Sequence, residues 1–212
     1  MNLKTQKLLL ASSLFIVAGA ASATDPAGYY GGISIGRSNI GPESGVLDSN
    51  LSAAQSLPGD VSGSIDRKDT GYKLRLGYDL GNGLAVEGGY IDFGKANYSG
   101  TSASTSNAAS GSIKAQGVNV DLIGKLPLAQ NVSVFGKAGL LFSSLNTEAS
   151  VNGVSISDTA HRVVPGIGVG VDYSLTRTVA LRTEYERYYR LGNDSTGKGD
   201  ADLISVGANV RF

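Results

Sequence analysis

A short segment of strict alternation, GYKLRLGYDL at positions 71–80, constrains the fold of this 212-residue chain more than any other feature. Successive side chains of a β-strand point to opposite faces. One face of this segment is apolar and aromatic, and the other carries Lys73, Arg75 and Asp79. The segment is therefore predicted to be a strand whose two faces meet different environments.

The same pattern recurs along the chain. A tight Gly81-Asn82-Gly83 turn joins the first segment to LAVEGGYIDF, which predicts a β-hairpin. Each predicted strand has roughly ten residues, the length that a tilted strand needs to cross a bilayer. The eight predicted strands are 28–36, 71–80, 84–93, 117–126, 132–142, 163–173, 179–188 and 201–212.

The connections between these strands alternate between long and short. The long ones are 37–70, 94–112, 143–160 and 189–200, and the short ones are 81–83, 127–131 and 174–178. An even strand number with long loops on one side and short turns on the other is typical of outer-membrane barrels. We therefore predict an all-β fold, an eight-stranded antiparallel up-and-down transmembrane β-barrel. A soluble sandwich or barrel is the alternative, but it requires neither feature.

The first 23 residues are predicted to be a secretory signal peptide. Lys4 and Lys7 precede an apolar stretch at 8–18, and Ala21-Ser22-Ala23 follows, so cleavage is expected after Ala23. The apolar stretch is too short for a transmembrane helix, which needs about 20 residues. The predicted domains are thus a signal peptide at 1–23, which is cleaved, and an outer-membrane barrel at 24–212.

Composition and isolated motifs argue against several function classes. The predicted signal peptide removes two of the 18 basic residues and none of the 18 acidic ones, so the barrel has no basic excess that would favour nucleic acid. The chain has no cysteine for a disulfide or a thiolate metal site. His161, its single histidine, has neither further metal ligands nor a nucleophile in sequence context. We therefore expect that the protein is not an enzyme and that it binds neither a metal ion nor a cofactor.

The barrel interior is predicted to be filled with paired charges. An eight-stranded barrel is just wide enough for its own side chains, and an unpaired buried ion costs several kcal/mol. Six cations and six carboxylates share the face opposite the apolar one. They are Lys73, Arg75, Lys125, Lys137, Arg182 and Arg211, with Asp79, Glu87, Asp121, Asp172, Glu184 and Glu186.

Several blocks carry a resemblance to a known family. LAVEGGYIDFG, GVNVDLIGKLPL, VSVFGKAGL, GVGVDYSLTRTVALRTEYERY and SVGANVRF are similar, in order and spacing, to the transmembrane domain of the OmpA family of small outer-membrane barrels. The resemblance implies the outer membrane of a Gram-negative bacterium, with lipid and lipopolysaccharide as surroundings. Members with a periplasmic peptidoglycan-binding domain continue well past the barrel, so cell-wall anchoring is not expected of this chain.

The resemblance also implies roles for individual residues. Glu87 and Arg182 match the ion pair that blocks the lumen in that family, and Lys125 and Asp172 match alternative partners that can open it. A purely structural network is the competing interpretation, and it is favoured because buried pairs arise for architecture as readily as for switching.

Phe212 ends the last predicted strand in phase with its apolar face. The resemblance implies that the barrel-assembly machinery recognises such a terminal aromatic residue. A place in the aromatic girdle at the lipid interface is the simpler interpretation, and the two are compatible.

Two functions follow from these predictions. The favoured one is a monomeric structural or surface-interaction protein with mobile loops, and a surface ligand could bind to these loops. The alternative is a narrow porin-like channel that is gated by Glu87 and Arg182. The Ser-rich segments 37–70 and 98–112 are predicted to be mobile, whereas Asn152-Gly153 predicts a hairpin extending outward. Basic residues near the outer rim could pair with lipopolysaccharide phosphates or simply be solvated: Arg67, Lys68, Lys95, Lys114, Arg162, Arg187 and Arg190.

Overall fold

The computed structural model describes residues 27–41, 48–50, 52–53, 61–151, 154–191 and 199–212. The predicted signal peptide, its cleavage after Ala23 and the predicted Asn152-Gly153 turn lie outside these residues. Within the described part, no helix has the length and apolar character needed to cross a membrane.

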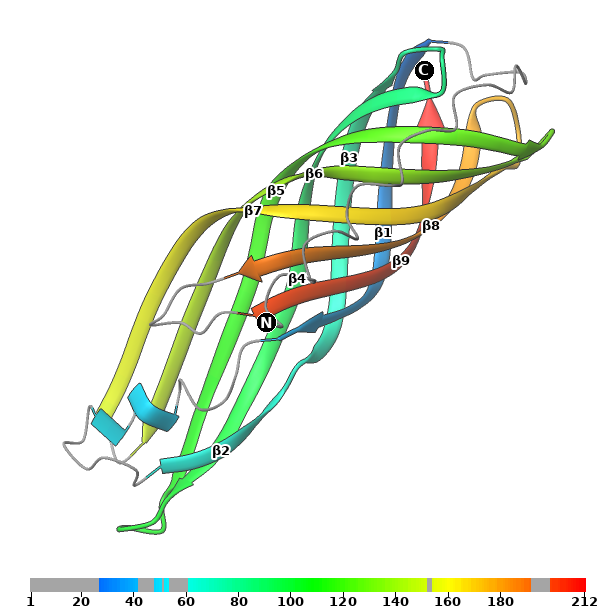
Figure 1. The fold of residues 1–212 in the computed structure, drawn as a ribbon. Helices are drawn as coiled ribbons and strands as arrows, with labels where there is room; N and C mark the ends of the chain where they lie inside the picture. Colours follow the sequence, from blue (N-terminus) through cyan, green and yellow to red (C-terminus); the bar gives the residue numbers. More distant parts are fainter. Residues whose placement is uncertain (1–26, 42–47, 51, 54–60, 152–153, 192–198) are drawn as a thin grey trace, which may run out of the picture.

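The described residues form a closed ring of antiparallel strands (Figure 1). The sheet order is β2-β4-β3-β1-β9-β8-β7-β6-β5, and an additional pairing of β4 with β5 closes the ring. Eight strands complete the barrel, while β2 extends the sheet beside β4 beyond β3. The strands are β1 Gly28–Ile40, β2 Val61–Asp66, β3 Lys68–Asp79, β4 Leu84–Ser102, β5 Ala108–Ala129, β6 Val132–Val151, β7 Val154–Ser174, β8 Val179–Leu191 and β9 Gly199–Arg211. The predicted eight-stranded barrel is confirmed.

The outer surface of the barrel is apolar. Ile33, Leu74 and Val169 are each about 60% exposed (65%, 60% and 59%), which is the arrangement that lipid requires of the outward face. Phe212 lies at the short-turn end, where its ring stacks on Tyr29 with centroids 6.5 Å apart and its N–H donates to the Tyr29 carbonyl at 3.0 Å. Phe212 therefore belongs to an aromatic girdle, and its role in assembly stays a prediction.

Strands β4 to β7 are much longer than the ten residues predicted. They have 19 to 22 residues and continue past the barrel as paired ribbons on the side opposite the short turns (Figure 1). The β6–β7 ribbon expected from the sequence is present, and its pairing runs to Val151 and Val154.

The prediction that the low-complexity segment 98–112 is a loop is wrong. β4 and β5 stay paired up to Thr101 and Ala108, and the chain reverses through a turn in which Ser102 N–H donates to the Asn107 carbonyl at 3.0 Å. The physical reason is that buried and exposed side chains alternate here as in any strand, but small residues make this alternation hard to detect in the sequence. Tyr98 and Ala109 point to a buried face, while Ser99, Thr101 and Ser110 alternate with them and are exposed. The long first connection is likewise shortened by strand residues, since β1 runs to Ile40 and β2 occupies 61–66.

A β-bulge at Gly94 marks the point where β4 leaves the barrel. The register between β4 and β5 shifts between Asp92 and Lys95, and Gly94 has a φ of 76°. The Asp69 carboxylate of β3 accepts the N–H of Lys95 at 2.7 Å, which fixes the bulge to the neighbouring strand. Bulges of this kind bend a strand and increase its local twist.

Candidate functional site in the barrel lumen

Arg182 of β8 forms the centre of a buried ion-pair cluster in the lumen. Its Nη1 donates to Glu87 Oε2 of β4 at 2.8 Å, while its Nε and Nη2 donate to the two carboxylate oxygens of Asp172 on β7, both at 2.7 Å. The Phe135 ring lies 4.3 Å from the guanidinium carbon, and the Tyr30 hydroxyl donates to Glu87 at 3.1 Å. Arg182 thus holds both carboxylates at once.

A second cluster lies beside the first and joins β3, β6 and β8. Lys137 Nζ is 3.0 Å from Glu184, Arg75 Nη1 is 2.9 Å from Glu184, and Lys73 Nζ is 2.9 Å from Glu186. Lys73 also lies 3.4 Å from Glu87, which connects the two clusters. These side chains are at most 2% exposed, so water does not screen the network.

Lys125 lies closer to the mouth at the short-turn end. Its Nζ is 2.6 Å from Asp79 Oδ2, and Arg211 Nη2 is 3.2 Å from the same oxygen. An exchange of partners with Glu87 would therefore require Lys125 to leave Asp79. A cavity of about 60 Å³ opens here and reaches Asp172 and Arg182, room for a few waters at about 10–15 Å³ each.

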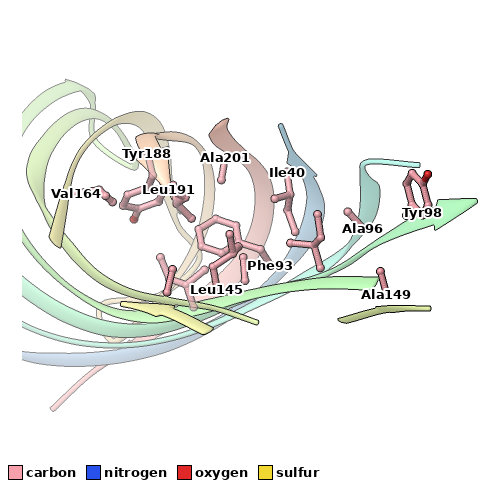
Figure 2. Packing of buried hydrophobic residues seen from close by; sticks show 14 of the residues in the cluster. Ile40, Phe93, Ala96, Tyr98, Leu145, Ala149, Val164, Tyr188, Leu191 and Ala201 are labelled. Carbon is pink, nitrogen blue, oxygen red and sulfur yellow. The ribbon is translucent and has the colours of Figure 1, made fainter. Parts of the chain in front are cut away.

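The other half of the lumen is filled by apolar side chains (Figure 2). Phe93 of β4 and Tyr188 of β8 pack edge to face with ring centroids 5.6 Å apart. They belong to a large buried cluster, called here the apolar plug: Ile40, Ile91, Phe93, Leu141, Leu145, Val164, Tyr188, Leu191 and Leu203, with smaller neighbours. The Tyr188 hydroxyl donates to Glu186 at 2.8 Å and joins the plug to the charged network.

The twelve charged residues assigned to the lumen from the sequence all lie in this interior or at its mouth. Asp79, Lys125 and Arg211 form the group at the mouth. The other nine belong to the two linked clusters: Lys73, Arg75, Glu87, Asp121, Lys137, Asp172, Arg182, Glu184 and Glu186. Sequence reasoning missed the apolar plug, although a signal was present. Phe93 and Leu141 share the phase of Glu87 and Lys137 on their strands and so had to point inward.

A closed antiparallel ring with an apolar outer surface and a filled, ion-paired interior defines a β-barrel protein of the Gram-negative outer membrane. Residues 25–212 match the model of the OmpA-like transmembrane domain, and the chain belongs to this family.

The curated relatives share the family but are longer. Outer membrane protein A of Serratia marcescens is 29% identical over 155 residues, covering 71% of this chain and 42% of that protein. The Yersinia pseudotuberculosis protein of the same name is 29% identical over 154 residues, with the same coverage. The chain thus spans less than half the length of these relatives.

Solved structures share the fold at low identity. Neisserial surface protein A aligns with a TM-score of 0.53 at 17% identity, covering 87% of this chain and 97% of that one. OprG from Pseudomonas aeruginosa gives 0.53 at 15% identity, covering 90% and 98%. The family and these neighbours are outer-membrane barrel proteins.

Proposed function

We propose that the protein is a monomeric structural and surface-interaction protein whose barrel is closed and whose ribbons project from the cell surface. The observation that carries this proposal is a lumen filled in two successive layers, the charged network and the apolar plug. A solute would have to displace both.

The charged layer alone resists opening. Arg182 is 1% exposed and shared between Glu87 and Asp172, so removing it from either leaves a buried carboxylate without its main partner. Breaking such a pair costs about 3–5 kcal/mol. The plug beyond it is built mainly from hydrocarbon and aromatic side chains, which do not replace the hydration shell of an ion, and the Tyr188 hydroxyl already donates to Glu186.

Planar-bilayer recording of the refolded protein tests the proposal. We expect the current to stay at the level of the protein-free membrane, while heat-modifiable mobility in detergent gels shows that the barrel is folded. Frequent, long-lived conductance steps from folded wild-type protein would contradict a closed scaffold.

A narrow channel for ions or very small solutes, gated by Glu87 and Arg182, is the second candidate. The cavity of about 60 Å³ that leads from the short-turn end to Arg182 favours it. This candidate requires the Glu87→Ala variant to conduct more than the wild type, because Arg182 would lose one of its two carboxylate partners. Unchanged conductance in that variant would remove the basis for a gate.

Two partners complete the proposal. The paired ribbons of β4 to β7 offer a surface ligand a far more rigid surface than mobile loops would. The last strand, ending at Phe212, is the segment that the barrel-assembly machinery would recognise. Loss of Phe212 is then expected to impair insertion without affecting export.

A further inference from the structure

The outer face of β4 to β7 continues from the membrane to the ribbons, with one register shift at the Gly94 bulge of β4. The pairing register aligns outward side chains in rows across these four strands. The last apolar row consists of Tyr90, Val118, Phe142 and Val163, each 42% to 56% exposed. This row marks the upper edge of the lipid-facing surface.

The next two rows on the same face are polar and then cationic. The first consists of Asp92, Gln116, Ser144 and His161, and the second of Lys95, Lys114, Asn146 and Thr159. Lys114 Nζ lies 3.4 Å from Asp92 and is 37% exposed, so it can still reach a second anion. Lysines one or two rows above the apolar edge lie at the depth of anionic head groups.

Above the lysines, where β2 joins the sheet, the face becomes rich in small hydroxyl side chains. The first row still has two carboxylates and consists of Asp66, Asn97, Ser112, Glu148 and Ser157. The next row is serine in all five strands: Ser64, Ser99, Ser110, Ser150 and Ser155. Ser110 precedes Val118 by eight positions, roughly 27 Å along the strand at about 3.4 Å per residue. With the usual tilt of about 40°, the serine row stands roughly 20 Å above the last apolar row.

This hydroxyl face differs from an ordinary solvated surface. The opposite side of the same strands is packed, with Tyr98, Ile113 and Ala149 at most 5% exposed, so the ribbons are ordered on that side. Above the lysines its outer side carries mostly serine, threonine and asparagine, and its charged residues there are Asp66 and Glu148, whereas solvent-facing strands usually carry more charge. Ser99 and Ser110 are exposed and present hydroxyls that can both donate and accept hydrogen bonds.

We propose that this flank binds a phosphorylated glycolipid of the outer leaflet, with its acyl chains, phosphates and saccharide at successive heights. The acyl chains lie on the apolar rows, the phosphates contact Lys95 and Lys114, and the sugar hydroxyls bond to the serine and asparagine rows. Continuity with the lipid-facing surface of the same strands selects this occupant. Across the barrel, Arg187 is 2.7 Å from Asp200 and 3.6 Å from Asp202, so it is held between two carboxylates where Lys114 contacts Asp92 alone. The proposal does not depend on whether the lumen conducts.

The test compares two glycolipids that differ in saccharide. Protein purified from outer membranes and delipidated in detergent is titrated with fluorescently labelled lipid A, which has phosphates but no extended sugar, and with rough lipopolysaccharide, which carries the core saccharide. We expect the affinity for rough lipopolysaccharide to exceed that for lipid A by about tenfold or more, because the sugar would form several additional hydrogen bonds with the serine hydroxyls.

Matched variants locate the contacts. Replacing Ser99, Ser110 and Ser150 together by valine removes the hydroxyls, whereas replacing them by threonine adds the same bulk and keeps them. The valine variant should lose the advantage of rough lipopolysaccharide while binding lipid A as before, and the threonine variant should keep it. Lys95→Gln with Lys114→Gln should weaken the binding of both lipids.

Three outcomes would overturn the proposal. These are equal affinity of the wild type for the two lipids, equal affinity of the folded valine and threonine variants for rough lipopolysaccharide, or no effect of the lysine variants on lipid A. Heat-modifiable mobility confirms that each variant is folded, so that a weak binder is not simply an unfolded protein.

Discussion

Gly94 occupies a backbone position that suits only glycine. Its φ of 76° is left-handed, and a Cβ there would lie 2.8 Å from the Thr70 carbonyl oxygen. The Gly94→Ala variant should lose about 1–3 kcal/mol of unfolding free energy in urea titrations in lipid vesicles. Gly88→Ala on the same strand is the control, since its Cβ would meet no atom closer than 3.8 Å. Equal stability of the two variants would show that the bulge is not strained by alanine.

The hydrogen bond that fixes the same bulge depends on pH, because it requires the ionised carboxylate of Asp69. The N–H groups of Lys95 and then Thr70 bond to its carboxylate and hold the pKa of this group below the ordinary value of 3.8. A lowered folded-state pKa means that the stabilisation is complete above the unfolded value and is lost as the pH falls through the folded one. The Lys95 amide shift in NMR spectra should therefore titrate with a midpoint below 3.8. A midpoint at or above 3.8 would contradict the bond.

Single residues also show what could be predicted from the sequence. Glu87 and Arg182 could be assigned to the lumen because strand phase alone decides which face a side chain occupies. Their pairing was implied by the family resemblance. Neither strand phase nor the resemblance predicted that Arg182 binds Asp172 at the same time. The position of Lys125 beside Asp79 depends on the stagger between strands around the ring, which alternation does not encode.

At the scale of elements, the strands within the membrane were predictable and the ribbons only partly so. The Asn152-Gly153 signal predicted the β6–β7 extension because its turn chemistry is specific. The β4–β5 extension was missed because serine and alanine differ little in hydropathy, so that low complexity concealed a period of two. The pairing of Ser99 with Ser110, and of Ser110 with Ser150, shows that polar composition does not prevent a strand whose other face is buried.

For the whole molecule, the eight-stranded count limits the lumen, and the side chains then fill it in two chemically different layers. The charged network lies toward the short turns, and the apolar plug closes the end from which the ribbons project. Strand phase predicted the first layer. The second layer does not follow from the pattern of charges, although Phe93 and Leu141 are in phase with the charged residues of their strands.

The most direct test of this two-layer closure is the bilayer conductance of three folded variants: Glu87→Ala, Phe93→Ala with Leu141→Ala, and all three changes together. The neighbouring lipid-facing Leu140→Ala is the matched control for truncation. The two-layer account predicts that the control and the first two variants stay at the wild-type baseline and that only the combined variant conducts. A Glu87→Ala variant that conducts as well as the combined one would show that the charged pair alone closes the barrel, and would contradict the account.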